Sequence, residues 1–147
     1  MSATLREKAL RLLAQREHSR AELARKLSDE GEQDEIAALL TRFEECGLLS
    51  DSRFAGQFVS SRAGRFGTRK LQYELKQRGV ADADAAGALA AIGEDDATRA
   101  RAVWARKFDA LPADAKSWAK QARFLQSRGF SADSIRKVLR QHPEQDE

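Results

Sequence analysis

The chain has 147 residues, a formal net charge of +3 and a single cysteine, Cys46. This length suits one ordinary domain or a short array of small units. One cysteine excludes an internal disulfide bond and a cysteine metal cluster. No apolar run approaches the length that crosses a bilayer, and no signal-peptide pattern opens the sequence. We therefore expect a cytoplasmic protein without membrane association, in which Cys46 is a small buried thiol.

The composition favours helices. The sequence has two prolines and many good helix formers, and no segment alternates polar and β-branched residues as a strand does. Much of the apolar content is alanine, which removes little surface from water when it is buried. Several small helical cores in series therefore fit the composition better than one thick core.

The charges are distributed unevenly along the chain. Residues 29–46 are mostly acidic, residues 53–80 are mostly basic, and the tail at 143–147 is acidic again. Such a distribution suits docking to a partner that carries both signs of charge. The alternative is that solvated helix faces differ by chance.

Three helices are predicted in the first third of the chain. Thr4 and Glu7 form a capping box at the start of the first helix, and Ser19 and Glu22 form another at the start of the second. The third helix is predicted over residues 33–46, where apolar side chains recur at helical spacing before a glycine.

The middle of the chain carries two helices joined by a basic elbow, which we define as residues 62–70. Asp51 is a suitable N-cap for the first of these helices. Thr68 can begin the second, and Gly79 fits the position after its last turn, where a left-handed backbone favours glycine. Across residues 53–80, Glu74 is the single acid among seven lysines and arginines.

Further helices complete the pattern. One is predicted over residues 82–92, and the next begins after a cap at Asp95 or Asp96. A third is predicted over residues 113–128, and the last begins after a cap at Ser131.

The predicted helices sort into groups of three. Leu27, Leu75 and Leu125 each stand four residues before a glycine, at intervals of 48 and 50 residues. This spacing is typical of helical repeats, and a single helical bundle is the alternative. The predicted boundaries are 1–49, 50–93 and 94–142 for three repeats and 143–147 for an acidic tail.

Two linked motifs in the middle of the chain resemble the RecX family. The sequence reads Asp-x-Arg-Phe-Ala-x-x-Phe-Val-x-Ser-Arg over residues 51–62 and Gly-x-Arg-x-Leu-x-x-Glu-Leu-x-x-Arg-Gly-Val over residues 67–80. Both closely resemble the central motif of RecX proteins, and a weaker resemblance extends over nearly the whole chain. Thr68 stands where many members have proline, and Leu71 and Val80 stand where isoleucine is common.

RecX proteins are bacterial regulators of the RecA recombinase. The resemblance implies an all-α fold of three tandem three-helix repeats in an elongated, curved array. It also implies a negative regulator that binds RecA, or the RecA filament on single-stranded DNA, and inhibits filament assembly, ATP hydrolysis, recombination and coprotease activity. Homologous recombination, DNA repair and the SOS response are the processes implied. We expect a monomer without a cofactor, and weak non-specific DNA binding would fit an accessory role.

No arrangement of residues predicts catalysis. The sequence offers no catalytic residue, no cofactor site and no metal-ligand spacing, and the glycines of the elbow lack the strand that precedes a phosphate-binding loop. His18 and His142 stand at helix ends beside polar neighbours, where a histidine is usually solvated. We therefore expect a protein that is not an enzyme.

The elbow and its surroundings carry the candidate binding residues. Guanidinium groups bind phosphates and carboxylates in a bidentate manner, and an aromatic ring such as Phe66 or Tyr73 can stack on a base. The alternative is a solvated basic face on which Tyr73 is partly packed. The candidates for contact with RecA or DNA are Arg53, Arg62, Arg65, Arg69, Lys70, Tyr73, Lys76, Arg78, Arg123 and Arg128.

Two other groups of residues are expected to have structural or solvated positions. The first group contains cations before the predicted linker, namely Arg99, Arg101, Arg106 and Lys107, which we expect to be solvated. The second group contains aromatic residues at helical spacing, which we expect in the core, namely Phe54, Phe58, Trp104, Trp118 and Phe124.

Two further functions compete with the one that the resemblance implies. Ser19 and Thr68 each open a helix as a recognition helix opens, so the main alternative is a stand-alone DNA-binding module of tandem helix-turn-helix-like units. A protein-only helical scaffold with another partner is the third hypothesis.

Overall fold

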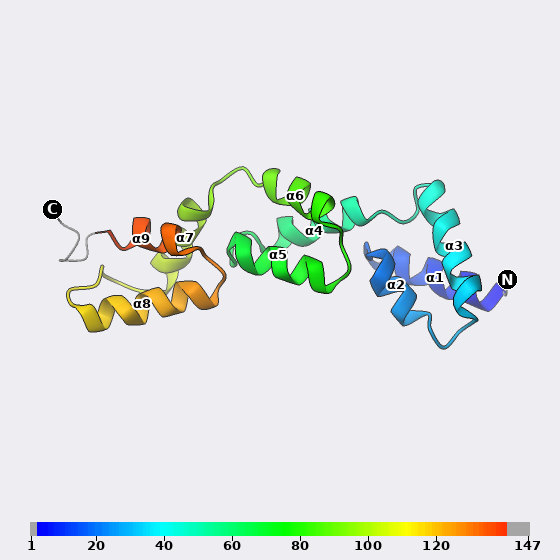
Figure 1. Ribbon diagram of the computed structural model, residues 1–147, viewed down its shortest axis with the longest axis horizontal. Helices are drawn as coiled ribbons and strands as arrows, with labels where there is room; N and C mark the ends of the chain where they lie inside the picture. The colour runs from blue at the N-terminus through cyan, green and yellow to red at the C-terminus, as the bar shows by residue number, and fades with distance from the viewer. Residues whose placement is uncertain (1–2, 141–147) are drawn as a thin grey trace. The chain divides into compact units, whose positions relative to one another are not determined.

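The computed structural model describes residues 3–140, and this part of the chain contains nine α-helices and no β-strand (Figure 1). The helices are α1 (Ala3–Gln15), α2 (Arg20–Lys26), α3 (Gln33–Glu45), α4 (Asp51–Arg62), α5 (Thr68–Gln77), α6 (Asp82–Ala90), α7 (Asp96–Lys107), α8 (Ala115–Ser127) and α9 (Ala132–Val138). The prediction of an all-α fold is confirmed.

The first three helices enclose a core of mainly leucine side chains. On α3, Ile36, Leu39, Leu40 and Phe43 recur at helical spacing and are all buried. The same cluster contains Leu5, Ala9, Leu23, Leu27 and Leu49. This group is therefore a small core of its own.

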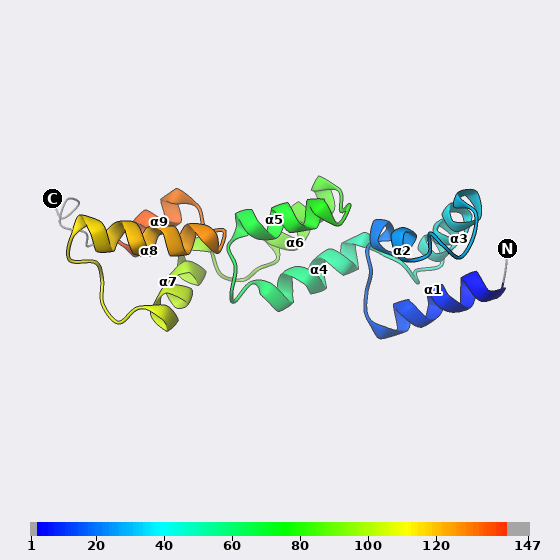
Figure 2. The same cartoon turned by 90° about the horizontal axis from the view of Figure 1, so that it is seen from below.

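The last three helices form a second core. α7 packs against both α8 and α9, and both ribbon views agree on this arrangement (Figures 1 and 2). Leu125 and Leu139 are fully buried there. The Trp104 indole N–H donates to Gln121 Oε1 at 2.7 Å, and Gln121 Nε2 donates to the Ala110 carbonyl at 3.1 Å. The buried amide therefore keeps partners for both of its ends.

The helices divide into two compact units, and the division passes through α4, α5 and α6. The first unit contains the residues up to Phe58 together with Leu75–Ala88, and the second contains Val59–Glu74 and the residues from Leu89 onward. Each of the two cores described above lies within one unit. The boundaries expected for three repeats stay a prediction.

Several helix ends follow the local signals in the sequence. Ser19 and Glu22 form the predicted capping box of α2, and the Ser131 hydroxyl accepts from the Ser134 N–H at the start of α9. Asp95, rather than Asp96, caps α7 by accepting from the Thr98 N–H. The local chemistry of a cap is therefore sufficient to place these starts.

Other helix ends differ from the prediction. Asp51 is the first residue of α4 and not its cap, because its carboxylate binds another helix, as described below. The Ser50 hydroxyl caps α4 instead and accepts from the Arg53 N–H at 3.1 Å. In addition, α6 ends at Ala90 and α8 begins at Ala115, so both are shorter than predicted.

Two side chains lie in environments opposite to those predicted. His18 is buried, with 1% of its surface exposed, because it lies just before α2 with its ring nitrogens 3.0 Å from the Arg16 carbonyl and 3.1 Å from Nζ of Lys26 at the end of that helix. Cys46 is exposed, because it follows the last turn of α3 after the buried Phe43. His142 and the predicted acidic tail lie outside the described residues. None of the described helices is long and apolar enough to cross a membrane.

Candidate functional site

The start of α2 is held by residues from two later segments of the first unit. The Asp51 carboxylate accepts a hydrogen bond from the Arg20 backbone N–H at 2.7 Å. The Ser19 hydroxyl donates to the Arg78 carbonyl at 2.7 Å. Burial raises the pKa of Asp51, although the Arg20 N–H opposes the change. We call this arrangement of Ser19, Arg20, Asp51 and Arg78 the first joint.

The start of α5 is held in the same way within the second unit. The Asp96 carboxylate accepts from the Thr68 backbone N–H at 2.9 Å. The Gly67 N–H donates to the Arg128 carbonyl at 2.7 Å. We call this arrangement of Gly67, Thr68, Asp96 and Arg128 the second joint. Asp51 and Asp96 are each the first residue of a helix, so the two joints share this contact. The donor to the arginine carbonyl differs, because it is a hydroxyl in the first joint and a backbone N–H in the second.

At each joint, a glycine allows two segments of the chain to approach closely. Gly79 has a φ of +79°, and a Cβ on this residue would lie 2.5 Å from the Cβ of Ala21. Gly129 has a φ of +91°, and a Cβ there would overlap the Cβ of Lys70. Both positions therefore need glycine for two reasons, the left-handed backbone and the close approach of another helix.

Asp96 also binds the start of α9. Its second carboxylate oxygen accepts from the Ser131 N–H at 3.3 Å. Burial by itself would raise the pKa of Asp96, but the hydrogen bonds from Thr68, Ser134 and Ser131 hold the pKa below its ordinary value. One ionised carboxylate thus serves the starts of two helices.

The elbow gathers cations around one aromatic ring. Arg65 Cζ lies 5.4 Å, Lys70 Nζ 5.2 Å and Arg128 Cζ 6.0 Å from the centre of the Phe66 ring. These distances are within the range of cation–π attraction. A guanidinium that stacks on a ring still presents its N–H edge to a phosphate or carboxylate.

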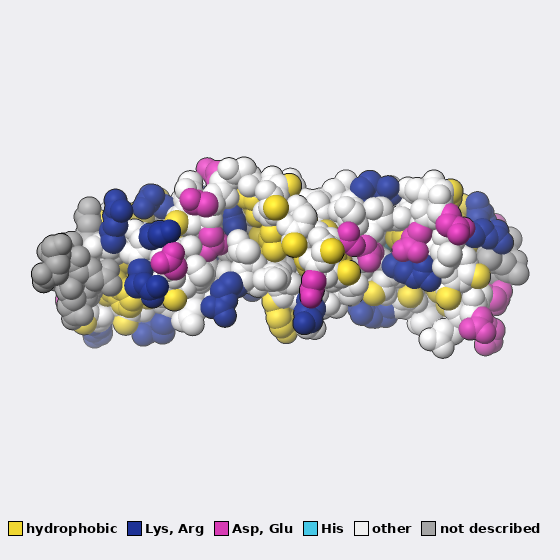
Figure 3. Space-filling view, turned by 45° about the horizontal axis from the view of Figure 1, so that its top comes forward, with side chains coloured by type: hydrophobic (Ala, Val, Ile, Leu, Met, Phe, Trp, Pro, Cys, Tyr) yellow, Lys and Arg dark blue, Asp and Glu magenta, His cyan; other side chains and the backbone are white. Residues whose placement is uncertain are grey.

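The cluster continues onto α8. Arg128 Cζ lies 4.9 Å and Lys107 Nζ 5.5 Å from the centre of the Phe124 ring. The Phe124 ring also forms an edge-to-face pair with Phe108, at 5.5 Å between ring centres. We call the following six residues the cation–aromatic strip: Arg65, Phe66, Lys70, Lys107, Phe124 and Arg128. Figure 3 shows Lys and Arg side chains prominent on the face over α7, α8 and α9.

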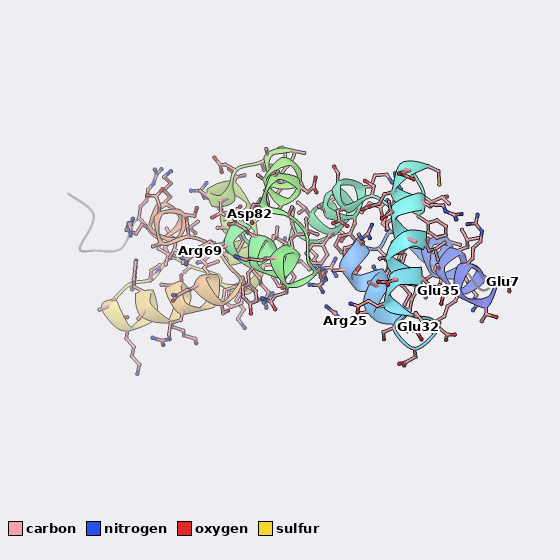
Figure 4. All side chains as sticks on the ribbon, turned by 45° about the vertical axis from the view of Figure 1, so that its right-hand side comes forward. Glu7, Arg25, Glu32, Glu35, Arg69 and Asp82 are labelled. Atoms are coloured by element: carbon pink, nitrogen blue, oxygen red, sulfur yellow. The ribbon has the colours of Figure 1, made fainter. Side chains whose placement is uncertain are left out.

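Three candidate side chains of the second unit are exposed beside the strip. Arg69 extends from the first turn of α5 (Figure 4), and Arg123 lies on α8. Neither guanidinium makes a hydrogen bond or ion pair with a residue that the structure describes. Tyr73 is 62% exposed, so most of its surface is accessible, and the alternative of a solvated basic face stays a prediction. These groups are available to a partner.

The other candidates are placed differently. Arg62 donates to the Ser61 hydroxyl at 3.0 Å. Arg53, Lys76 and Arg78 belong to the first unit. Arg53 pairs with Glu17 at 2.8 Å, and Arg78 lies 4.6 Å from the Phe58 ring centre and 3.8 Å from Glu22. The structure therefore brings together only the candidates around Phe66, whereas Arg53 and Arg78 are already engaged.

Arg99 has a structural role that its sequence pattern did not predict. It was expected to be solvated, but only 3% of its surface is exposed, because it points into the second unit and binds the elbow. Arg99 stands three residues after Asp96, just as Phe54 stands three residues after Asp51. This alignment with an apolar residue was the available signal for burial. Lys107 is exposed as expected, and its ammonium also lies beside the ring of the partly buried Phe124. Phe54 and Phe58 are buried as predicted.

Several acids of the first unit cap a helix or pair with a cation. Glu32 and Glu35 flank the start of α3, where they form a capping box (Figure 4). Glu44 pairs with Arg20 at 2.6 Å, and Glu30 with Lys8 at 3.0 Å. Among residues 3–140, no three His, Cys, Asp or Glu side chains are grouped as metal ligands.

Comparisons with known families match the chain in three successive parts. The models of the first, second and third three-helix domains of RecX match residues 6–43, 50–89 and 94–139. The prediction of three three-helix domains in tandem is therefore confirmed.

Relatives with the same name match almost the whole chain. Regulatory protein RecX of Leptothrix cholodnii is 46% identical over 138 residues, which cover 93% of this chain and 88% of the relative. Regulatory protein RecX of Pseudomonas fluorescens is 47% identical over 138 residues, with 92% and 89% covered. The crystal structure of RecX from Lactobacillus salivarius has a TM-score of 0.79 at 20% identity and covers 98% of this chain and 96% of that one, which shows a shared fold. The chain belongs to the RecX family of regulatory proteins.

Proposed function

We propose that this protein is a non-enzymatic negative regulator of RecA. It binds RecA, or the RecA filament on single-stranded DNA, and restrains filament assembly, ATP hydrolysis, recombination and coprotease activity. The observation that carries this proposal is membership in the RecX family along the whole chain, with relatives named as regulatory proteins at 40–47% identity.

The surface chemistry of the second unit supports a polyanionic partner. The cation–aromatic strip and the neighbouring Arg69 and Arg123 supply guanidinium and ammonium groups to phosphates or carboxylates. Tyr73 supplies an exposed ring. A nucleoprotein filament offers both phosphates and acidic side chains in a regular array, so several moderate contacts can add up.

The joints favour this proposal over a stand-alone DNA-binding module. A recognition helix reads bases with the residues near its N-terminus. In α2 and α5 those ends are occupied, because Arg20 and Thr68 donate to Asp51 and Asp96. Ser19 is fully buried. The first backbone N–H of each helix is therefore not available to a DNA phosphate without opening a joint.

The direct test is the ATPase activity of RecA on single-stranded DNA while this protein is titrated in. We expect the activity to fall. Loss of activity below one protein per RecA would indicate filament capping or spreading disruption, and a one-to-one requirement would indicate simple occlusion. Unchanged ATPase and strand-exchange activity at saturating protein, together with tight binding to one duplex sequence without RecA, would establish the DNA-binding alternative instead.

A further inference from the structure

Arg99 of α7 binds the backbone of the elbow from inside the second unit. Its Nη1 donates to the Ala63 carbonyl at 3.2 Å and to the Phe66 carbonyl at 2.8 Å. Its Nη2 donates to the Thr68 hydroxyl at 2.9 Å. One guanidinium thus holds the elbow from the end of α4 to the start of α5.

Neighbouring residues complete this attachment. Arg99 Nη2 lies 3.4 Å from Asp96 Oδ1, and the same oxygen accepts from the Thr68 N–H. Arg106, two turns further along α7, donates to the Gly64 carbonyl at 2.5 Å. The polar backbone of the elbow is therefore bound by side chains that come from α7.

An arginine is a costly residue for this position. Phe54 occupies the equivalent place after Asp51 in the first joint and is buried with 4% of its surface exposed. An apolar side chain can therefore fill the site, whereas a buried guanidinium must be compensated for lost hydration. The compensation is incomplete, because Arg99 Nε is buried and makes no hydrogen bond with the described residues. Packing alone does not explain a charged residue here.

We propose that Arg99 is a positioning residue, which fixes the elbow so that Arg65, Arg69 and Lys70 meet the partner at a set spacing. Arg99 touches no partner itself, since it is buried. It acts by holding the carbonyls of Ala63 and Phe66, and thereby the ring on which Arg65 and Lys70 lie. This inference rests on the proposed function for its consequence but not for its structural part.

The first measurement is hydrogen–deuterium exchange of the free protein, which does not involve RecA. In Arg99→Met, the amides of residues 63–69 are expected to exchange about tenfold faster, because charge-assisted hydrogen bonds are lost, while those of α8 keep their protection. Arg99→Lys should restore part of the protection. The matched control is Arg101→Met, which changes an exposed arginine on the same helix.

The second measurement is inhibition of RecA ATPase by the same variants. Arg99→Met should need about tenfold more protein for half inhibition. It should cause no further loss when Arg65, Arg69 and Lys70 are already alanine, because a positioning residue acts only through those cations. If Arg99 had only a structural role, Arg99→Met would instead weaken inhibition both in the unmodified protein and in the variant with the three alanines.

Unchanged elbow exchange in Arg99→Met would overturn the proposal, and so would faster exchange with unchanged inhibition. If Arg99→Met does not fold, Thr68→Val and Arg99→Lys decide the question, since Thr68→Val removes only the hydroxyl that Arg99 binds. If the unmodified protein does not inhibit RecA, the proposed function fails, whereas the exchange result still decides whether Arg99 holds the elbow.

Discussion

Asp51 and Asp96 make the same contact in two places. Each is the first residue of its helix, and each carboxylate accepts from the first backbone N–H of an earlier helix. Asp51 accepts from the Arg20 N–H at 2.7 Å, 31 residues earlier, and Asp96 accepts from the Thr68 N–H at 2.9 Å, 28 residues earlier. The carboxylate thereby accepts from an N–H group that has no partner within the earlier helix. Its negative charge also interacts favourably with the positive N-terminal end of that helix. Each joint thus depends on an acid from the following helical group.

Removal of Asp96 should destabilise the protein more than removal of Asp51. Asp96→Ala leaves the backbone N–H groups of Thr68 and Ser131 without their acceptor and removes the carboxylate beside the buried Arg99, so we expect a loss of about 3 kcal/mol in the free energy of unfolding. Asp51→Ala should cost about 1–2 kcal/mol. Urea denaturation measures both, with the exposed Asp133→Ala as control. Equal effects of Asp96→Ala and Asp133→Ala would contradict this role of the joint.

Glycine substitutions should separate the joints from ordinary helix positions. Gly129→Ala should cost more than about 1 kcal/mol, because it places a Cβ on a left-handed residue and against Lys70. Gly79→Ala should behave similarly. Gly87→Ala, within α6 and with open space around the new Cβ, should instead stabilise by up to about 1 kcal/mol. Thermal denaturation of the three variants gives the comparison. A stabilising Gly129→Ala would show that α8 and α5 do not approach as described.

Stability should fall as the pH is lowered from 7 to 5.5, in part because of His18. Burial lowers the pKa of His18 from its ordinary value of 6.5. The unfolded chain therefore binds a proton at a pH where the folded chain does not, and the free energy of unfolding decreases as the pH falls below that value. The stability that the neutral ring contributes is fully present above the ordinary pKa.

The variant His18→Gln keeps polar atoms near the Arg16 carbonyl and Lys26 but does not titrate in this range. Urea denaturation at several pH values should give a flatter profile for this variant than for the unmodified protein. Parallel profiles would mean that His18 titrates equally in both states.

The cations of the elbow should matter for inhibition and not for folding. Arg62, Arg65, Arg69 and Lys70 changed together to alanine should keep the helical circular dichroism and weaken inhibition of RecA ATPase. The loss should be larger at low salt, since screening already weakens these contacts at high salt. A matched control changes four exposed arginines elsewhere, namely Arg11, Arg25, Arg42 and Arg101. Inhibition that is lost equally in both variants would point to net charge alone, and unchanged inhibition would remove the elbow from the mechanism.

Local sequence patterns were sufficient to predict the helices and several of their ends. Ser19 with Glu22, Ser131 and Gly79 act on backbone groups within a few residues, so the local pattern was sufficient to place them. The spacing of Leu27, Leu75 and Leu125 likewise indicated the repeated groups, and all three are fully buried. The linked motifs were specific enough to identify the family before any fold was seen.

The side chains that hold the joints and the elbow depend on contacts between distant segments, which the sequence does not reveal. Asp51 has the residue type and position of a helix cap, but its partner lies 31 residues away, and nothing local distinguishes the two roles. The sequence around Arg99 predicts a solvated cation, because the carbonyls that Arg99 binds belong to the distant elbow. The cation–aromatic strip likewise depends on contact between Phe66 and Arg128. These residues are far apart in the sequence, so the partner of each is decided only when the chain folds.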